Sequence, residues 1–203
     1  MSPLLPEADT SSRHSRISVD SSVRRTLAAG GSVVVVFGGQ SSLFYAALLA
    51  STATTAFAIR HGSGLLRTVL PYSRAEELMI PSMDASFSAK ERMCVAVDAA
   101  AGITTGISAV DRSLTARILA DSTSVAADLV RPGHMMVTAV DGTSEFTTVS
   151  GIAMQTASLS GLGAAAVVTE LVGLRNPTGM MEADEAQQFA ATHALPVLRL
   201  PFG

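Results

Sequence analysis

From Gly102 to Arg112 the chain reads Gly102-Ile103-Thr104-Thr105-Gly106-Ile107-Ser108-Ala109-Val110-Asp111-Arg112. Thr104, Thr105 and Ser108 are suited to cap a helix that begins near Ala109, because their hydroxyls can accept hydrogen bonds from its first N–H groups. The positive end of the helix dipole, beside a glycine backbone, would favour a small anionic ligand in this threonine loop. An ordinary capped helix after a strand explains the same residues, so both interpretations stand at this point.

A second polar block follows the helix, at Arg131-Pro132-Gly133-His134. It places a basic pair beside a rigid Pro-Gly corner. Arg131 and His134 are therefore candidates either for holding an anion or for stabilising the corner or a dimer interface.

Composition narrows the class of protein. The chain has 203 residues, 48% of them hydrophobic, with a net charge of -3 and one cysteine, Cys94. This balance argues against nucleic acid or an anionic membrane surface as a partner. A single cysteine excludes an internal disulfide framework, so cytoplasmic location is the expectation, and no apolar run is long enough to span a membrane.

Hydrophobic patterning alternates helices and strands along the chain. Residues 1–16 lack periodicity, which predicts a mobile tail, and residues 17–203 read as one domain. Helices are expected at 18–29, 52–60, 109–120, 151–163 and 182–193, and strands at 32–36, 65–70, 93–97, 135–140, 145–148, 165–172 and 196–200. Residues 43–50 fit either form. A loop is expected at 37–42 and at 81–90, a capping box at Ser73-Arg74-Ala75-Glu76, and a hairpin around Asp141-Gly142.

Three blocks carry a family resemblance: Arg60-His61-Gly62-Ser63-Gly64-Leu65, the threonine loop with Thr115, and Arg131-Pro132-Gly133-His134. Their order and spacing resemble the 3,4-dihydroxy-2-butanone 4-phosphate synthase family of riboflavin biosynthesis, from about Val19 to Leu200. The resemblance implies an α/β fold with a mixed β-sheet covered by helices, and a homodimer with active sites near the subunit interface. It also implies conversion of ribulose 5-phosphate to formate and a four-carbon phosphate, with magnesium polarising the ketone.

The chain departs from the family pattern where the resemblance implies the metal site. In place of an acidic, arginine-containing loop it has Phe37-Gly38-Gly39-Gln40-Ser41-Ser42-Leu43-Phe44-Tyr45, without charge. In place of an Arg-x-Gly-His-Thr-Glu-Ala block it has Val149-Ser150-Gly151-Ile152-Ala153-Met154-Gln155. The phosphate arginine, the metal histidine and the neighbouring glutamate thus become Val149, Ile152 and Met154, which offer a hard cation no ligand. We expect no metal there, no cofactor and no ordinary synthase activity.

The substitutions run from charged to apolar, which predicts a largely apolar cavity if the family geometry holds. Its expected lining is Phe37, Leu43, Phe44, Tyr45, Val149, Ile152 and Met154. We therefore expect a repurposed isomerase, cyclase or lyase that acts without metal on a less polar, non-phosphorylated small molecule of a specialised biosynthetic pathway.

Glu170 and His134 are the candidate proton-transfer groups, with hydrogen bonds from Tyr45 or Thr104. Glu170 matches an active-site glutamate of the family, and a carboxylate in an apolar strand needs a partner or a task. Where the family usually has a cysteine, the chain has Arg67. The remaining expected ligand contacts are Thr105, Arg131, Phe37, Phe44, Ile152 and Met154.

Two other functions stay open. A catalytically silent dimeric scaffold would fill the pocket with Phe44, Ile152 and Met154, whereas a cavity that Glu170 reaches favours an enzyme. A true synthase would need its metal ligands in new positions.

Overall fold

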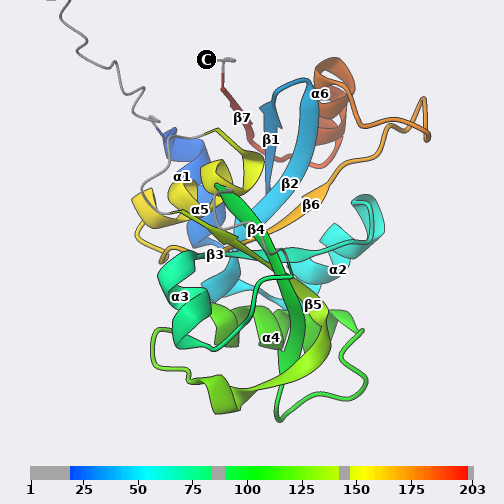
Figure 1. Ribbon diagram of the computed structural model, residues 1–203. Helices are drawn as coiled ribbons and strands as arrows, with labels where there is room; N and C mark the ends of the chain where they lie inside the picture. Colours follow the sequence, from blue (N-terminus) through cyan, green and yellow to red (C-terminus); the bar gives the residue numbers. More distant parts are fainter. Residues whose placement is uncertain (1–18, 84–89, 142–146, 201–203) are drawn as a thin grey trace, which may run out of the picture.

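The computed structural model describes residues 19–83, 90–141 and 147–200 (Figure 1). The expected tail at 1–16, the expected helix start at Ser18, and parts of the expected loop (84–89) and hairpin (142–146) lie outside these residues. The described residues form a seven-stranded mixed sheet with helices on both faces, so the predicted α/β architecture is confirmed.

The strands follow the order β4-β5-β3-β6-β2-β1-β7 across the sheet. They are β1 (Val33–Phe37), β2 (Gln40–Ala46), β3 (Arg67–Pro71), β4 (Glu91–Ala99), β5 (Leu129–Val140), β6 (Ala166–Glu170) and β7 (Val197–Arg199). β3 pairs with β5, and β1 with β7, in parallel; the other neighbours are antiparallel. The sheet therefore brings β3 beside β6, which is far from it in sequence.

The segment expected to be a loop after β1 is a tight hairpin. Phe37 pairs with Gln40, and Gly38 and Gly39 form the turn with φ of 66° and 73°. Two consecutive residues with positive φ suit a two-residue hairpin turn, and glycine adopts that backbone without a steric penalty. The undecided segment 43–50 divides between the end of β2 and a short 3-10 turn, Ala47–Leu49.

Helices cover the two faces with separate apolar cores. On one face α1 (Ser21–Ala28) and α5 (Val149–Leu159) pack on a core that includes Val35, Phe44 and Val168. On the other, the core includes Tyr45, Leu70 and Leu119. It is covered by α2 (Thr52–His61), α3 (Tyr72–Glu77), α4 (Ala109–Ala120) and α6 (Ala183–Thr192), with a 3-10 turn at Ala126–Asp128. Figure 1 shows α1 and α5 on the opposite side of the sheet from α2 and α6.

Two local predictions are wrong. α3 begins at Tyr72, with Pro71 at its N-cap and no side-chain cap bond, so Ser73 lies inside the first turn and forms no capping box. Residues 147 and 148 lead into α5 and form no strand; the Thr148 hydroxyl caps that helix by accepting from the Gly151 N–H at 3.1 Å. Among the described residues, no helix is both long enough and apolar enough to cross a membrane.

Candidate functional site

The strand register gathers polar side chains on the face of the sheet that α5 covers. Ser42 on β2 lies opposite Glu170 on β6, and Arg67 on β3 lies opposite Val168, two residues before Glu170. Because side chains alternate between the faces of a sheet, Arg67 and Glu170 point to the same side as Val168. Glu91 joins them from β4, where it pairs with Val140 of the same core.

These side chains line a cleft of about 400 Å³ at the first turn of α5. Its lining residues are Phe37, Gly38, Gln40, Ser42, Arg67, Glu91, Thr147, Thr148, Val149, Ser150 and Glu170. Most of them carry charged, hydroxyl or amide groups. The lining is thus mixed and less apolar than expected, with Phe37 and Val149 as apolar walls beside charged and hydroxyl groups.

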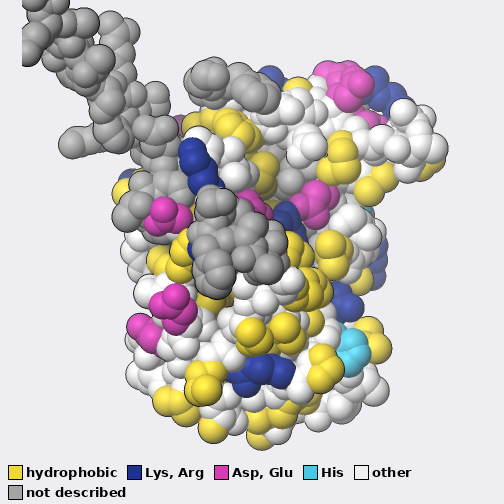
Figure 2. Space-filling view, viewed as in Figure 1, with side chains coloured by type: hydrophobic (Ala, Val, Ile, Leu, Met, Phe, Trp, Pro, Cys, Tyr) yellow, Lys and Arg dark blue, Asp and Glu magenta, His cyan; other side chains and the backbone are white. Residues whose placement is uncertain are grey.

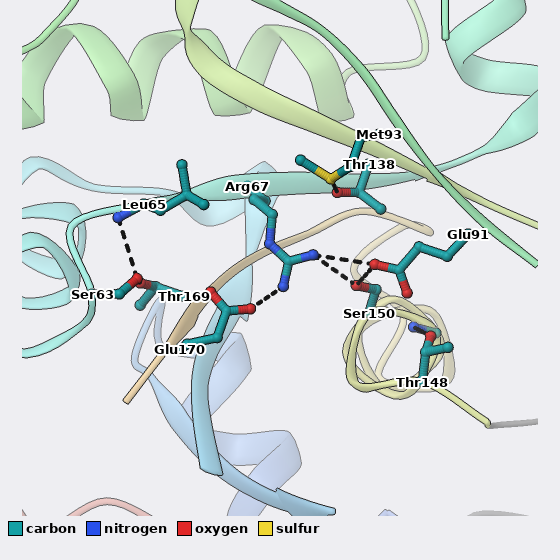
Figure 3. Close-up of polar contacts among 11 residues, drawn as sticks. Ser63, Leu65, Arg67, Glu91, Met93, Thr138, Thr148, Ser150, Thr169 and Glu170 are labelled. Atoms are coloured by element: carbon teal, nitrogen blue, oxygen red, sulfur yellow. Dashed lines mark hydrogen bonds and ion pairs between the residues drawn. The ribbon is translucent and has the colours of Figure 1, made fainter. Parts of the chain in front are cut away.

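Arg67 lies between the two carboxylates of the cleft (Figure 3). Its Nη2 donates to Glu170 Oε1, and its Nη1 donates to Glu91 Oε1 at 3.1 Å. The Ser150 hydroxyl donates to the same Glu91 oxygen at 2.7 Å. One guanidinium therefore ties together β3, β4, β6 and, through Ser150, the start of α5.

The ion network is only partly open to water. The Arg67 side chain is 12% exposed, and the Glu91 and Glu170 side chains are 25% and 26% exposed. Partial shielding from water makes such ion pairs stronger than fully exposed ones. Figure 2 shows Asp/Glu and Lys/Arg side chains lying close together near the middle of this face of the molecule. The partner that a carboxylate at Glu170 requires is thus Arg67.

Five of the expected cavity residues lie in the apolar cores instead. Leu43 and Tyr45 belong to the core under α2 and α4, and the other three to the core on the opposite face. Phe44 and Ile152 are 0% exposed and Met154 is 6% exposed, all packed in the core between the sheet and helices α1 and α5. None of them lines the cleft. Their positions on β2 and α5 face neighbouring apolar side chains, so core packing accounts for all of them, and the expected contact of Phe44, Ile152 and Met154 with a ligand stays a prediction.

Tyr45 points to the opposite face of the sheet from the cleft. It is 1% exposed, and its hydroxyl lies 3.0 Å from Thr55 Oγ1 on α2. Burial raises the pKa of the Tyr45 phenol well above its ordinary value. The structure therefore gives Tyr45 a packing role, and the predicted catalytic hydrogen bond from it has no route to Glu170.

The threonine loop holds a carboxylate that belongs to the chain itself. Asp111, 2% exposed, accepts hydrogen bonds from the Thr104 N–H at 3.2 Å, the Thr104 hydroxyl at 2.8 Å and the Gly106 N–H at 3.0 Å. Burial alone would raise the pKa of this carboxyl, but the hydrogen bonds outweigh it and hold the pKa below its ordinary value. Asp111 fills the place predicted for an anionic ligand, while Thr105 remains exposed.

The same helix start confirms the predicted cap. Ser108 is the N-cap of α4, and its hydroxyl accepts from the Asp111 N–H at 3.1 Å. The ordinary interpretation of the threonine loop, a capped helix after a strand, is thus the one the structure supports.

His134 forms a pair with a buried carboxylate. Asp98, 5% exposed, accepts from the His134 N–H at 3.0 Å and lies 2.7 Å from the His134 Nδ1 through its other oxygen. The His134 side chain is 44% exposed, so an oriented imidazole reaches the surface. Gly106 packs against this pair, so the threonine loop and His134 are neighbours. His134 does not line the cleft.

The Arg131 side chain hydrogen-bonds to backbone carbonyl groups. Its guanidinium donates to the carbonyl of Leu78, and to those of Leu129 and Ala126 at 3.3 and 3.4 Å. These carbonyls at the ends of neighbouring elements engage two of its nitrogens, which favours the alternative that Arg131 stabilises the corner, and ligand binding by Arg131 stays a prediction.

The donor set of the cleft does not fit a magnesium ion as it stands. Glu91 and Glu170 supply the carboxylates, and Arg67 binds both. Ile152, at the position of the metal histidine that the resemblance implies, lies in the core. In the described part of the chain, no three His, Cys, Asp or Glu side chains converge on a common point.

Sequence reasoning missed Glu91, Ser150 and Asp98 as members of polar clusters. Glu91 and Asp98 stand in one strand, where nothing in the local pattern marks them as partners of residues 24 and 36 positions away. The sequence did hold a signal for Glu91. Arg67 begins a buried strand, and a guanidinium with five N–H donors needs more than one acceptor, so a second carboxylate besides Glu170 was to be expected.

Comparison with known proteins gives one consistent family. The family model described as 3,4-dihydroxy-2-butanone 4-phosphate synthase matches residues 21–201. The chain is similar to the synthase of Chromobacterium violaceum, with 38% identity covering 69% of this chain and 68% of that protein. It is also similar to the synthase of Saccharomyces cerevisiae, with 33% identity covering 74% and 77%.

Solved structures agree with the sequence matches. A crystal structure of the Candida albicans synthase superposes with a TM-score of 0.79 and 30% identity, covering 87% of this chain and 91% of that one. A second synthase structure, described as a complex with two magnesium ions, also has a TM-score of 0.79, with 29% identity and coverage of 87% and 90%.

Proposed function

Because the chain belongs to the 3,4-dihydroxy-2-butanone 4-phosphate synthase family, we propose that it is an enzyme whose cleft binds a small, neutral, hydroxyl-bearing carbonyl compound. The proposed reaction is proton transfer next to the carbonyl, as in an isomerase, with Glu170 as the acceptor.

The charge of the cleft carries this proposal. Arg67 is the one Arg, Lys or His among the lining residues that the structure describes, and both Glu91 and Glu170 already engage it. A phosphate group needs cationic or N–H donors that are free to bind it. With two carboxylates and one guanidinium, the lining repels a phosphate and tolerates a neutral ligand.

The polar lining changes the substrate expected from the sequence. Gln40, Ser42, Thr147, Thr148 and Ser150 supply amide and hydroxyl groups around the cleft. Such groups recognise hydroxyl and carbonyl oxygens through hydrogen bonds. We therefore propose a substrate that is still non-phosphorylated but is polar, in place of the largely apolar one expected from the sequence.

Glu170 lies where proton transfer requires it. Its carboxylate faces the cleft and is partly exposed. In the proposed step the Glu170 carboxylate takes a proton from the hydroxyl-bearing carbon beside the carbonyl and returns it to the former carbonyl carbon. The proton of that hydroxyl moves to the former carbonyl oxygen. The product is an isomer of the substrate, so no co-reactant is needed. Arg67 acts on Glu170 by orienting the carboxylate.

The family's own reaction is the second candidate. Relatives that are 33–38% identical carry the name 3,4-dihydroxy-2-butanone 4-phosphate synthase, which favours it. The observation against it is that Arg67 is already paired with Glu91 and Glu170, so its guanidinium is not free to bind the substrate phosphate. A silent scaffold has less support, since Phe44, Ile152 and Met154 leave the cleft open.

Solvent exchange tests the proposal. In D₂O, a neutral ketose such as ribulose should gain deuterium beside its carbonyl in the presence of the protein, and Glu170→Gln should lower that rate by about 100-fold or more. Glu77→Gln, an exposed glutamate outside the cleft, serves as the matched control. Formate released from ribulose 5-phosphate with magnesium would instead establish the second candidate, and exchange that survives Glu170→Gln would refute the role of Glu170.

A homodimer remains part of the proposal. The Asp98–His134 pair presents an exposed imidazole outside the cleft of its own chain, a position from which it could serve a neighbouring subunit. Sedimentation of the purified protein gives the oligomeric state directly. The cytoplasmic location expected from the single cysteine likewise stays a prediction.

A further inference from the structure

We propose that Arg67 is the built-in cation of the cleft: its guanidinium takes the place between Glu91 and Glu170 that a divalent metal ion would otherwise occupy. The cleft of the natural chain should therefore bind magnesium or manganese weakly, and removal of Arg67 should create a divalent-cation site. The ion network alone carries this, whatever substrate the cleft binds.

The contacts of the guanidinium resemble those of a bridging ion. One nitrogen of Arg67 binds Glu170 and another binds Glu91, so a single positive group satisfies both carboxylates. Ser150 completes the arrangement by donating to the Glu91 oxygen that Arg67 Nη1 also contacts. Because the fork of an arginine is planar and rigid, it holds two acceptors in fixed directions, which a lysine cannot do.

A divalent ion would need the same oxygens. Magnesium and manganese prefer carboxylate and other oxygen ligands, and the cleft offers two carboxylates beside the hydroxyls of Ser42 and Ser150 and the amide oxygen of Gln40. A metal ion could bind Glu91 and Glu170 together only by displacing Arg67, whose side chain is 12% exposed. The displaced charge would then face the metal, which opposes binding.

Removal of Arg67 would change the cleft from one that opposes a divalent ion to one that favours it. Glu91 and Glu170 would face a common cleft with no positive group among its described lining residues. Two carboxylates near each other in a partly shielded site repel, and a divalent ion relieves that repulsion. The cation affinity of the cleft should therefore rise when the guanidinium is removed.

Manganese titration followed by electron paramagnetic resonance and calorimetry tests this, using the full chain. We expect Arg67→Met to bind one Mn²⁺ at least about tenfold more tightly than the natural chain, since it keeps the length of the stem but removes the charge. Adding Glu170→Gln to Arg67→Met should abolish the gain. Arg199→Ala, an exposed arginine outside the cleft, should change nothing.

Two results would overturn the proposal. One is an Arg67→Met protein that is folded by circular dichroism yet binds Mn²⁺ no more tightly than the natural chain. The other, which needs no Arg67 variant, is tight binding of Mn²⁺ by the natural chain that Glu170→Gln abolishes. If Arg67→Met does not fold, Arg67→Lys gives the comparison, because a single ammonium should hold the two carboxylates less completely and raise Mn²⁺ affinity by a smaller factor. Neither readout depends on turnover, so the proposed isomerase can fail while the built-in cation stands.

Discussion

The carboxylate of Asp111 accepts hydrogen bonds from both the backbone N–H and the hydroxyl of Thr104, at 3.2 and 2.8 Å. The Gly106 N–H adds a third bond. The loop that looks like an anion site in the sequence is therefore closed by an anion of the chain itself. Stability of the loop, more than ligand binding, should depend on this contact.

Asp111→Asn should lower the thermal midpoint of unfolding by several degrees, because an amide in this position turns a donor toward N–H groups that need an acceptor. Thr105→Ala, at an exposed neighbouring position, should leave the midpoint nearly unchanged. Calorimetry of the two variants measures both effects. Equal midpoints for Asp111→Asn and the natural chain would contradict the structural role of Asp111.

The same carboxyl makes stability depend on pH. Its pKa is lowered in the folded state, so its contribution is fully present above the pKa of an unfolded aspartate, about 3.9, and is lost as pH falls through the folded value. The stability difference between the natural chain and Asp111→Asn should thus shrink below about pH 4. Urea unfolding across that range checks the sign, and a difference that grows on acidification would be the opposite result.

Gly106→Ala should disrupt the Asp98–His134 pair. An added Cβ would lie 2.2 Å from Asp98 Oδ2 and 2.6 Å from His134 Nδ1, and the φ of 82° already disfavours alanine. We expect the free energy of unfolding to fall by at least about 2 kcal/mol, measured by denaturant unfolding, and the NMR resonance of the His134 ring to shift.

Gly161→Ala is the matched control for the backbone strain that alanine suffers at a positive φ. Gly161 has a φ of 76° and nothing within 4 Å of an added Cβ, so strain alone should cost roughly 1–2 kcal/mol. Equal losses for the two glycine variants would mean that contact with the Asp98–His134 pair is unimportant.

Tyr45→Phe should leave catalysis intact. The hydroxyl is buried against Thr55, away from the cleft, so its removal should cost about 1 kcal/mol of stability and leave deuterium exchange at the natural rate. Urea unfolding and the exchange assay report the two quantities separately. A large loss of exchange in a stable Tyr45→Phe protein would restore the catalytic role that the sequence suggested.

Ile152→Ala should destabilise the chain by about 2–5 kcal/mol, because Ile152 is fully buried between α5 and the sheet. Leu159→Ala, on the same helix but 42% exposed, should cost clearly less. Denaturant unfolding gives both values. Similar losses would show that position 152 is not part of a closely packed core.

Local patterns predicted most of the fold. The strand β1, the Ser108 cap of α4 and the helix α6 all appear where the sequence indicates them. These features depend on residues a few positions apart, so the sequence is enough to find them. The failed capping box at Ser73 shows the limit, since α3 begins two residues earlier, with Pro71 in place of Ser73 at the N-cap.

The candidate site was harder to predict because its members come from separate elements. The direction of the substitutions suggested an apolar pocket, but strand alternation sends Phe44 into one core and Tyr45 into the other, and neither lines the cleft. The choice between an anion site and a plain cap at the threonine loop depended on where the Asp111 side chain turned.

The sequence by itself determined the alternation of helices and strands, and its blocks of residues carried the resemblance to the family that the comparisons show. Tertiary structure alone decided that Arg67, from β3, meets Glu91 from β4 and Glu170 from β6. The physical reason is pairing at long range: the order and register of the strands decide which charges share a face, and local hydrophobic periodicity carries no information about either.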